Sequence, residues 1–516
     1  MPHRWSILFA VAACSHPAPP ATAVAVPVAQ LGVHRAQVAA QVQPLFDEEL
    51  ISGLVVGLYD AGKTEIYGFG EGPNHATPDG TTLYEIGPVT KVHTSLLFAD
   101  AVQRREVELD TPLAELLPLG VTVPIRENVV ITLRHLVLHT AGLARLPPAL
   151  AVHSAEPDPY AHYGEDAMYR DLIRAQLEAT PGTQVSYSNF GVGVLGFALG
   201  HKLGGGFAKQ VTERVLRPLG LTDTFLTVPA AAVARRARGT NEDLANTVPW
   251  TFDAMAASAG MTSSARDLLK LIEAELDAAA GGTTLPLRRA MKLSQEPQLD
   301  RAGDNEGLGW MIDGAGRYWH NGGTGGFHAF VGFDPKTRRG VVLLASTATA
   351  LVDRLSDAMY KVLDGASPPP PKLAGPAELA AFVGTYELSG TKLQVVADGK
   401  RLYLEGPGEP RHRLAPFSDH ELWLEALQSV VVFEKDGDKV VRVLFGIGDH
   451  MLVAPRVEPG APAAPGAKPA PDAKPAPDAK PAPGAKPAPD AKPAPAAGAK
   501  PAPAPEDAKP APAPKK

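Results

Sequence analysis

Three short segments of this sequence carry side chains suited to acyl-transfer chemistry. Lys91 lies in "IGPVTK", Tyr187 and Asn189 lie in "VSYSNFG", and His320 lies in "WHNGGTGGF". A buried lysine whose pKa is lowered can serve as a base for a hydroxyl group, and a phenol can transfer protons. A carboxamide can bind a substrate amide. These residues predict one site, assembled from distant parts of the chain.

Position 88 is where a nucleophile would act together with Lys91, and it holds a proline. In a helix that begins near Pro88, positions 88 and 91 share one face, as in the S-x-x-K pattern. Proline offers neither a hydroxyl group nor a backbone N–H. Thr90 would face away, and Ser95 would lie ~10 Å further along the helix axis. We therefore expect neither neighbour to replace the nucleophile.

The glycines after His320 predict a strand whose backbone approaches a ligand closely. Gly322 and Gly323 carry no side chain, and the N–H of Gly323 is a candidate oxyanion donor, with Thr324 next to it. The segment lacks the lysine and the following helix of a phosphate loop, so we expect no nucleotide and no other cofactor.

Two histidines form the only pattern that suggests a metal. His135 and His139 are i and i+4 in "ITLRHLVLHTAGL", which we predict to be a helix ending in a glycine turn. No "HE" pair or third ligand accompanies them. We therefore predict that they are structural and that the chain has no metal site.

Taken in order, the motifs resemble those of the serine β-lactamase-like family, which are S-x-T-K, Y-x-N and H-x-G or K-T-G. That family includes class C β-lactamases, penicillin-binding DD-peptidases and related esterases. "PGTQVSYSNFG", "RPLGLTDT", "SSARDLLKL" and "GLGW" are also similar to family segments, and the resemblance spans about residues 35 to 350. It implies an α/β (α+β) fold, an antiparallel sheet flanked by helices with a helical subdomain.

The resemblance also assigns roles to residues of this chain. The implied catalytic residues are Lys91, Tyr187 and His320, and the implied substrate-binding residues are Asn189, Gly322, Gly323 and Thr324.

The departure from the family is at the nucleophile. In the family, the backbone N–H at this position is one of two oxyanion donors, so Pro88 removes both the attacking atom and a donor.

Our first hypothesis is a pseudoenzyme that binds peptidoglycan-type peptides or small acyl ligands. The second is an active esterase, peptidase or β-lactamase that uses another nucleophile or water. The third is a structural tether between membrane and cell wall. The alternative to a functional role is that Lys91 is only a buried lysine paired with Tyr187.

Turn residues and alternating apolar runs predict the domain organisation. "ISGLVVGLYDAGKTEIYGFG" and the segment with the "DPKTRRG" turn each predict a hairpin, and helices lie between them. The first and last strands should then meet in one sheet. We place the β-lactamase-related domain at 31–365, a proline-rich linker at 366–373 and a small antiparallel β domain at 374–457.

The two ends of the chain carry signals of a different kind. "MPHRWSILFAVAAC" resembles a bacterial lipoprotein signal, with residues 1–13 removed and Cys14, the one cysteine, lipidated before a spacer at 14–30. The expected location is the cell envelope, where the lipid would anchor the protein to the membrane.

The "AKPAPD" repeats of 458–516 predict a disordered tail, either a spacer or a weak binder of anionic polymers. A net charge of −7 with no basic, aromatic-interleaved face argues against nucleic acid, and nothing signals an oligomeric state.

Overall fold

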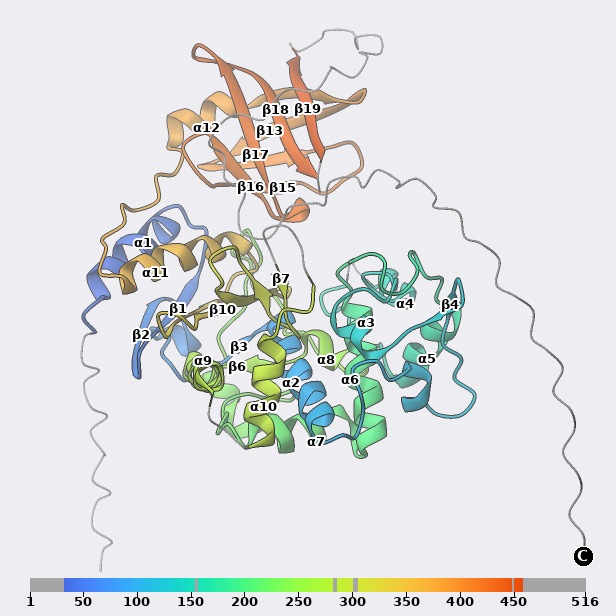
Figure 1. Cartoon of the computed structure of the whole chain (residues 1–516). Helices are drawn as coiled ribbons and strands as arrows, with labels where there is room; N and C mark the ends of the chain where they lie inside the picture. The colour runs from blue at the N-terminus through green and yellow to red at the C-terminus, as the bar shows by residue number, and fades with distance from the viewer. Residues whose placement is uncertain (1–31, 154–155, 282–284, 300–304, 448–449, 458–516) are drawn as a thin grey trace, which may run out of the picture.

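The larger unit of the molecule is built on one antiparallel sheet. The computed structural model describes residues 32–153, 156–281, 285–299, 305–447 and 450–457 (Figure 1). The seven-stranded sheet has helices on both faces and a helical region beside it, which confirms the expected fold class. In spatial order its strands are β2 (Lys63–Gly70), β1 (Gly53–Asp60), β11 (Arg339–Ala345), β10 (His328–Asp334), β9 (Tyr318–Gly323), β8 (Met311–Ile312) and β7 (Asn305–Glu306).

Helices and two small ribbons complete this unit. The helices are α1 (Arg35–Asp47), α2 (Thr90–Gln103), α3 (Leu133–Val137), α4 (Pro148–Ala151), α5 (Glu165–Arg174), α6 (Asn189–Leu203), α7 (Gly206–Val211), α8 (Ala256–Ala259), α9 (Ala265–Ala280), α10 (Pro286–Gln295) and α11 (Leu355–Leu363). The ribbons pair β3 (Tyr84–Glu85) with β6 (Thr262–Ser263), and β4 (Ile125–Arg126) with β5 (Val129–Val130).

The first and last strands of the sheet pair as expected. β1 runs antiparallel to β11, with Leu54 opposite Ala345 and Asp60 opposite Arg339. The last apolar segment forms three strands rather than the single hairpin expected, because the glycine-rich stretch after β9 makes a second turn. In that turn Thr324 N donates to Phe327 O at 3.0 Å, and β9 then pairs with β10.

Both faces of the central strands are buried, and successive side chains enter different cores. Val55 of β1 packs in one core with Leu269 of α9, whereas the next residue, Val56, packs in another with Met359 of α11. Helices α1 and α11 cover that second face together (Figure 1). The near-continuous apolar runs of β1 and β11 therefore reflect burial on two sides.

Helix α2 runs through the middle of the helical region and is buried on every side. Residues 90–101 are all buried, and α2 packs against α6, α8 and α10. Two of its polar side chains are bonded to backbone groups: Thr90 Oγ1 accepts from Met261 N at 3.0 Å, and Thr94 Oγ1 donates to Ala257 O at 2.7 Å. Lys91, in the first turn, is consequently held inside the protein.

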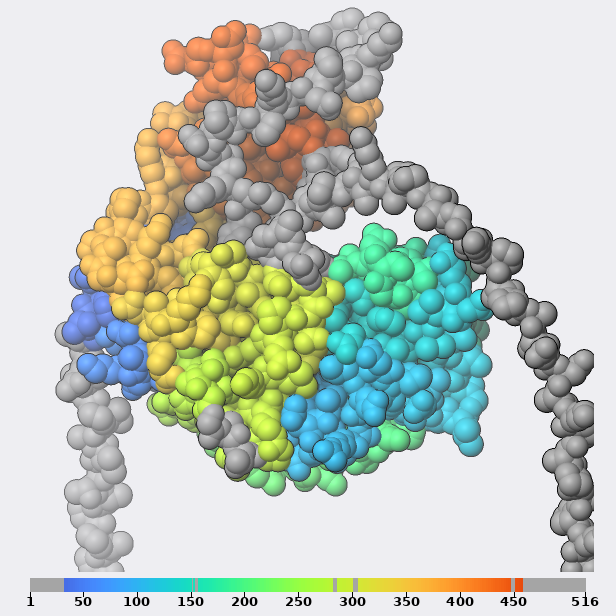
Figure 2. All heavy atoms as spheres, viewed as in Figure 1, coloured from blue at the N-terminus to red at the C-terminus, as the bar shows by residue number. Residues whose placement is uncertain are grey.

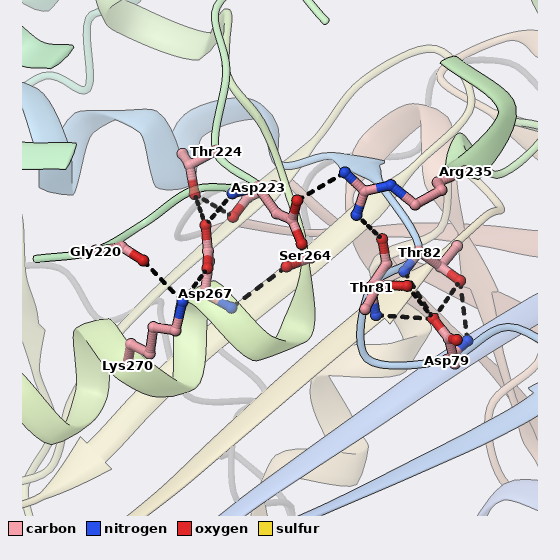
Figure 3. A network of polar contacts seen from close by, with 11 residues as sticks. Asp79, Thr81, Thr82, Gly220, Asp223, Thr224, Arg235, Ser264, Asp267 and Lys270 are labelled. Atoms are coloured by element: carbon pink, nitrogen blue, oxygen red, sulfur yellow. Dashed lines mark hydrogen bonds and ion pairs between the residues drawn. The ribbon is translucent and has the colours of Figure 1, made fainter. Parts of the chain in front are cut away.

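A buried carboxylate fixes the start of α9 against the loop before it (Figure 3). Ser264 caps the helix by accepting from Asp267 N at 3.3 Å. The fully buried Asp267 carboxylate accepts from Asp223 N at 2.6 Å and pairs with Lys270 at 2.9 Å. Arg235 in turn donates to Asp223 at 2.7 Å. This network joins the segments "RPLGLTDT" and "SSARDLLKL", which therefore serve the fold.

The predicted helix over "ITLRHLVLHTAGL" is shorter than expected, and the i, i+4 placement of its histidines is wrong. Helix α3 covers only Leu133–Val137, and His139 lies beyond it with a positive φ of 57°. His135 Nδ1 accepts from Thr132 N at 3.2 Å in a capping box, whereas His139 Nδ1 accepts from Ser188 N at 3.1 Å. Each ring thus has a structural partner. Among the described residues, no group of three or more His, Cys, Asp or Glu side chains has the arrangement of a metal site.

The second unit is a closed β-barrel with one helix, α12 (Pro376–Phe382). The sequence predicts a small antiparallel β domain here, and the structure confirms that class. In order, the barrel strands are β12 (Gly384–Leu388), β13 (Thr391–Asp398), β14 (Arg401–Glu405), β15 (His412–Pro416), β16 (Glu421–Leu424), β17 (Ser429–Asp436), β18 (Lys439–Ile447) and β19 (His450–Val457).

The barrel is seated over one end of the larger unit (Figure 2). Trp423 of the barrel is buried in the same apolar cluster as Met359 of α11. Tyr403 donates to Asp243 Oδ1 at 2.7 Å, and the buried Arg413 donates to Glu49 O at 3.1 Å. The two units therefore share apolar core as well as polar contacts.

No helix within the described ranges is both long enough and apolar enough to span a bilayer. The expected signal, Cys14 and the repeat tail all lie outside the described residues.

One buried acid should make the stability of the protein depend on pH. Glu275 of α9 is fully buried beside Gln295, and burial raises the pKa of its carboxyl from 4.5 to about 8. The folded state then keeps a proton that the unfolded chain releases above about pH 4.5, so stability falls as the pH rises from there toward 8. We expect Glu275→Gln to remove this loss and to stabilise the protein by on the order of 4 to 5 kcal/mol at and above pH 8.

Thermal unfolding of both proteins across this pH range measures the effect. Glu273→Gln, on the exposed face of the same helix, is the matched control and should follow the wild type. Parallel pH curves for Glu275→Gln and the wild type would contradict the prediction.

Candidate active site

The amine of Lys91 is the centre of the candidate site. Its Nζ donates to Asn189 Oδ1 at 2.6 Å and to Ser258 O at 2.9 Å. Burial, and then the charge of Arg145, lower the pKa of Lys91 well below its usual value. A neutral amine has two hydrogens, and these two acceptors use both of them. Its lone pair therefore remains available to take a proton.

Tyr187 lies against Lys91 through the face of its ring. The Lys91 Nζ is 4.8 Å from the ring centroid, and the His139 ring packs on the same tyrosine at 4.5 Å. Burial raises the pKa of Tyr187 above its ordinary value, so the phenol keeps its proton at neutral pH. The Lys91 amine therefore lies over the face of the Tyr187 ring.

Tyr187 lies in the loop that leads into helix α6. Ser188 caps α6 by accepting from Gly191 N at 2.9 Å, and Asn189 is the first residue of that helix. The Ser188 hydroxyl also donates to Ala144 O at 2.7 Å. These bonds hold the Asn189 amide in place opposite Lys91.

Two residues that the sequence did not single out adjoin this group. The Arg145 guanidinium lies 5.2 Å from the centre of the Tyr187 ring, and the Arg145 carbonyl accepts from Asn189 N at 2.9 Å. Tyr160 hydrogen-bonds to Asn189 and packs its ring on Phe252 at 4.5 Å. Neither occurs in a recognised motif, and only the folded chain brings them to the lysine.

His320 approaches from the opposite side, on β9. It is buried, and its Nδ1 donates to Asn321 O at 2.6 Å, which leaves Nε2 as an acceptor. Burial, and then the charge of Lys91, lower the pKa of His320 to about 3, so the ring is neutral at physiological pH. Asp353 braces this strand by accepting from Asn321 Nδ2 at 2.6 Å and by pairing with His328 at 2.8 Å.

Pro88 packs directly against the glycines of β9. It lies in the 3₁₀ turn Gly87–Val89 that leads into α2. A Cβ atom on Gly322 would lie 2.6 Å from Pro88 N, so that position accepts no side chain. Gly87 has a φ of +48°, and a Cβ there would lie 2.8 Å from Gly323 O. The turn and the strand therefore fit together because both are glycine at the contact.

Comparison with known proteins identifies the family. The sequence profile described as Beta-lactamase matches residues 38–366, which is more than half of the chain. The chain belongs to the beta-lactamase family. It is 27% identical to a beta-lactamase of Pseudomonas fluorescens over 352 residues, which cover 60% of this chain and 93% of that protein.

Further relatives come from Escherichia coli K12. A beta-lactamase is 26% identical over 364 residues, covering 63% of this chain and 91% of the relative. The D-alanyl-D-alanine-carboxypeptidase/endopeptidase AmpH is 28% identical over 312 residues, covering 57% of this chain and 79% of the relative. The resemblance stated from the motifs is thereby confirmed.

The beta-lactamase-family site of this chain has a solvent-facing side. Gly323 and Arg145 are exposed, and Pro88 and Tyr187 are half-buried. Thr324 differs from these residues, because it is buried, with its side chain near Glu85. Fold and sequence therefore bring Lys91, Tyr187, Asn189, His320 and Gly322 to one place, whereas Thr324 lies on the inner side of the turn.

Thr90 and Ser95 carry the hydroxyl groups that were considered as replacements for a nucleophile at position 88. Thr90 is committed to the backbone of Met261. Ser95 is buried against Gly309, where a Cβ would come within 2.5 Å of Ser95 Oγ. Both hydroxyl groups therefore lie in the buried packing around α2.

Pro88→Ser should gain covalent reactivity, because it supplies both the hydroxyl and the N–H that proline lacks. One oxyanion donor is worth ~10²–10³ in turnover in other hydrolases, so we expect labelling by a fluorescent penicillin on the order of 10²-fold faster than the wild type or more. Intact-mass measurement would show the adduct. Pro88→Ala restores only the N–H and should stay unlabelled. A folded but inert Pro88→Ser would show that residues other than Pro88 also prevent the chemistry.

Proposed function

We propose that this beta-lactamase-family protein binds acyl-D-alanyl peptides of the peptidoglycan type, or related acyl ligands, without forming an acyl-enzyme. The observation that carries the proposal is Pro88, which stands where a hydroxyl would be needed while the surrounding groups remain ordered around Lys91. The printed names of the relatives, beta-lactamase and D-alanyl-D-alanine-carboxypeptidase/endopeptidase, support this class of ligand.

The polar groups of the site suit an amide ligand. The exposed edge of β9 at Gly323 offers backbone groups to an extended peptide, and beyond the β8 pairing this edge has no paired strand among the described residues. Asn189 supplies an amide N–H₂ from the other side, since its oxygen is engaged by Lys91. A carbonyl group placed between them would meet donors on both sides.

A second candidate function is hydrolysis by an activated water molecule. The lowered pKa of Lys91 favours it, because a neutral amine with a free lone pair is a base for water. The missing N–H of Pro88 opposes it, because the oxyanion would have one donor fewer. We rank this candidate second for that reason.

Binding and chemistry can be separated in one experiment. We expect the wild type to bind N-acetyl-D-alanyl-D-alanine in calorimetry, to gain no mass with a fluorescent penicillin and to leave nitrocefin intact. Lys91→Met, which disrupts the Asn189 contact, should weaken binding on the order of tenfold. Lys292→Met, on the exposed face of α10, is the control. A covalent adduct, or nitrocefin turnover lost in Lys91→Met, would replace the proposal with the hydrolase.

The proposed location is the bacterial cell envelope, with a lipid on Cys14. Support comes from the sequence alone: the cationic start, the short apolar run and the position of the single cysteine in "VAAC". The repeat tail would then act as a spacer or as a weak tether to anionic wall polymers.

Cys14→Ser should release the protein from the membrane fraction into the soluble envelope fraction, because a single residue carries the anchor. Fractionation followed by immunoblotting measures the change, and deletion of residues 459–516 serves as a control that keeps the anchor. Unchanged membrane association of Cys14→Ser would rule out the lipoprotein assignment.

A further inference from the structure

Arg145 places an exposed positive charge at the edge of the site. Its guanidinium lies over the Tyr187 ring, 5.2 Å from the centroid, on a residue that also contacts the Lys91 amine. The Arg145 backbone is fixed, because its carbonyl accepts from Asn189 N at 2.9 Å and Phe190 N at 3.3 Å. The charge is thus built into the site and is not carried by a loose surface loop.

Within the described ranges, no acidic side chain pairs with this charge. Among the residues that the structure describes, none forms an ion pair with Arg145, and its contact with Tyr187 leaves the guanidinium donors exposed to solvent. The acid that acts on Tyr187 is Glu306, which is buried and engaged in other contacts. A planar guanidinium with free donors is suited to bidentate binding of a carboxylate.

The guanidinium lies close to the centre of the site. Arg145 Cζ and Lys91 Nζ lie 5.2 Å and 4.8 Å from the centroid of the same Tyr187 ring. A ligand that reaches Lys91 over this ring would therefore also come near Arg145.

An aromatic wall stands beside this end of the site. Tyr160 packs on Phe252 at 4.5 Å and on Trp250 at 5.4 Å, and the Trp250 indole donates to Pro157 O at 3.0 Å. A Cβ atom on Gly325, in the turn after β9, would lie 2.6 Å from the same indole. The wall therefore connects Tyr160 with the turn after β9.

We propose that Arg145 binds a carboxylate of the ligand and so makes the site selective for anionic acyl peptides. The proposal rests on the binding function proposed above. The carboxylate could belong to the acyl side of the peptide or to its C-terminus, and the two sources share one chemistry.

Three probes of nearly equal size distinguish these sources. N-succinyl-D-alanyl-D-alanine carries both carboxylates, its succinamoyl analogue carries only the C-terminal one, and its C-terminal amide carries only the acyl-side one. Calorimetry would be carried out with the full chain as wild type, Arg145→Gln and Arg145→Lys. Arg174→Gln, which removes the same charge from an exposed position on α5, is the matched control.

We expect loss of one carboxylate from the probe to weaken wild-type binding on the order of tenfold, the size of one charge-assisted contact. Arg145→Gln should abolish that difference, Arg145→Lys should keep part of it, and Arg174→Gln should keep all of it. Wild-type binding that is indifferent to both carboxylates, or a preference that survives in Arg145→Gln, would overturn the role of Arg145 and leave the binding function standing. Failure of the wild type to bind any probe would overturn both.

Discussion

The buried amine of Lys91 is the constraint on which the site depends. Its two hydrogen bonds, to Asn189 Oδ1 and to Ser258 O, connect the first turn of α2 with the start of α6 and with α8. A charged ammonium would be costly in this environment, so burial lowers its pKa and favours the neutral amine. The same contacts that stabilise the helical region thus produce a base at its centre.

Pro88 fits the packing around it. Proline suits the first turn of a helix because its φ is already helical and its missing N–H would be unpaired there. The ring also fits against Gly322, where no Cβ can be accommodated. The surroundings of position 88 are therefore complementary to the residue present, and Lys91 hydrogen-bonds to Asn189 close by.

The barrel is more closely joined to the rest of the protein than a linker suggests. Trp423 is buried in the core that covers one face of the sheet, and Arg413 is buried among backbone carbonyls of the larger unit. Near this contact, Glu425 of the barrel accepts from Ala350 N at 3.1 Å, close to Asp353, which braces β9. Residues of the barrel and residues of the site thus belong to adjoining parts of one structure.

The sequence by itself determined the sheet class, the meeting of its first and last strands, the second β unit and the group formed by Lys91, Tyr187, Asn189 and His320. Apolar periodicity and motif order carry that information locally. Only the tertiary structure decided that Arg145 and Tyr160 join the site, that Thr324 turns inward and that α3 ends before His139. It also decided that the barrel shares a core with the sheet. These outcomes depend on contacts between residues far apart in the chain, which no local pattern specifies, because packing and burial are settled only when the segments meet.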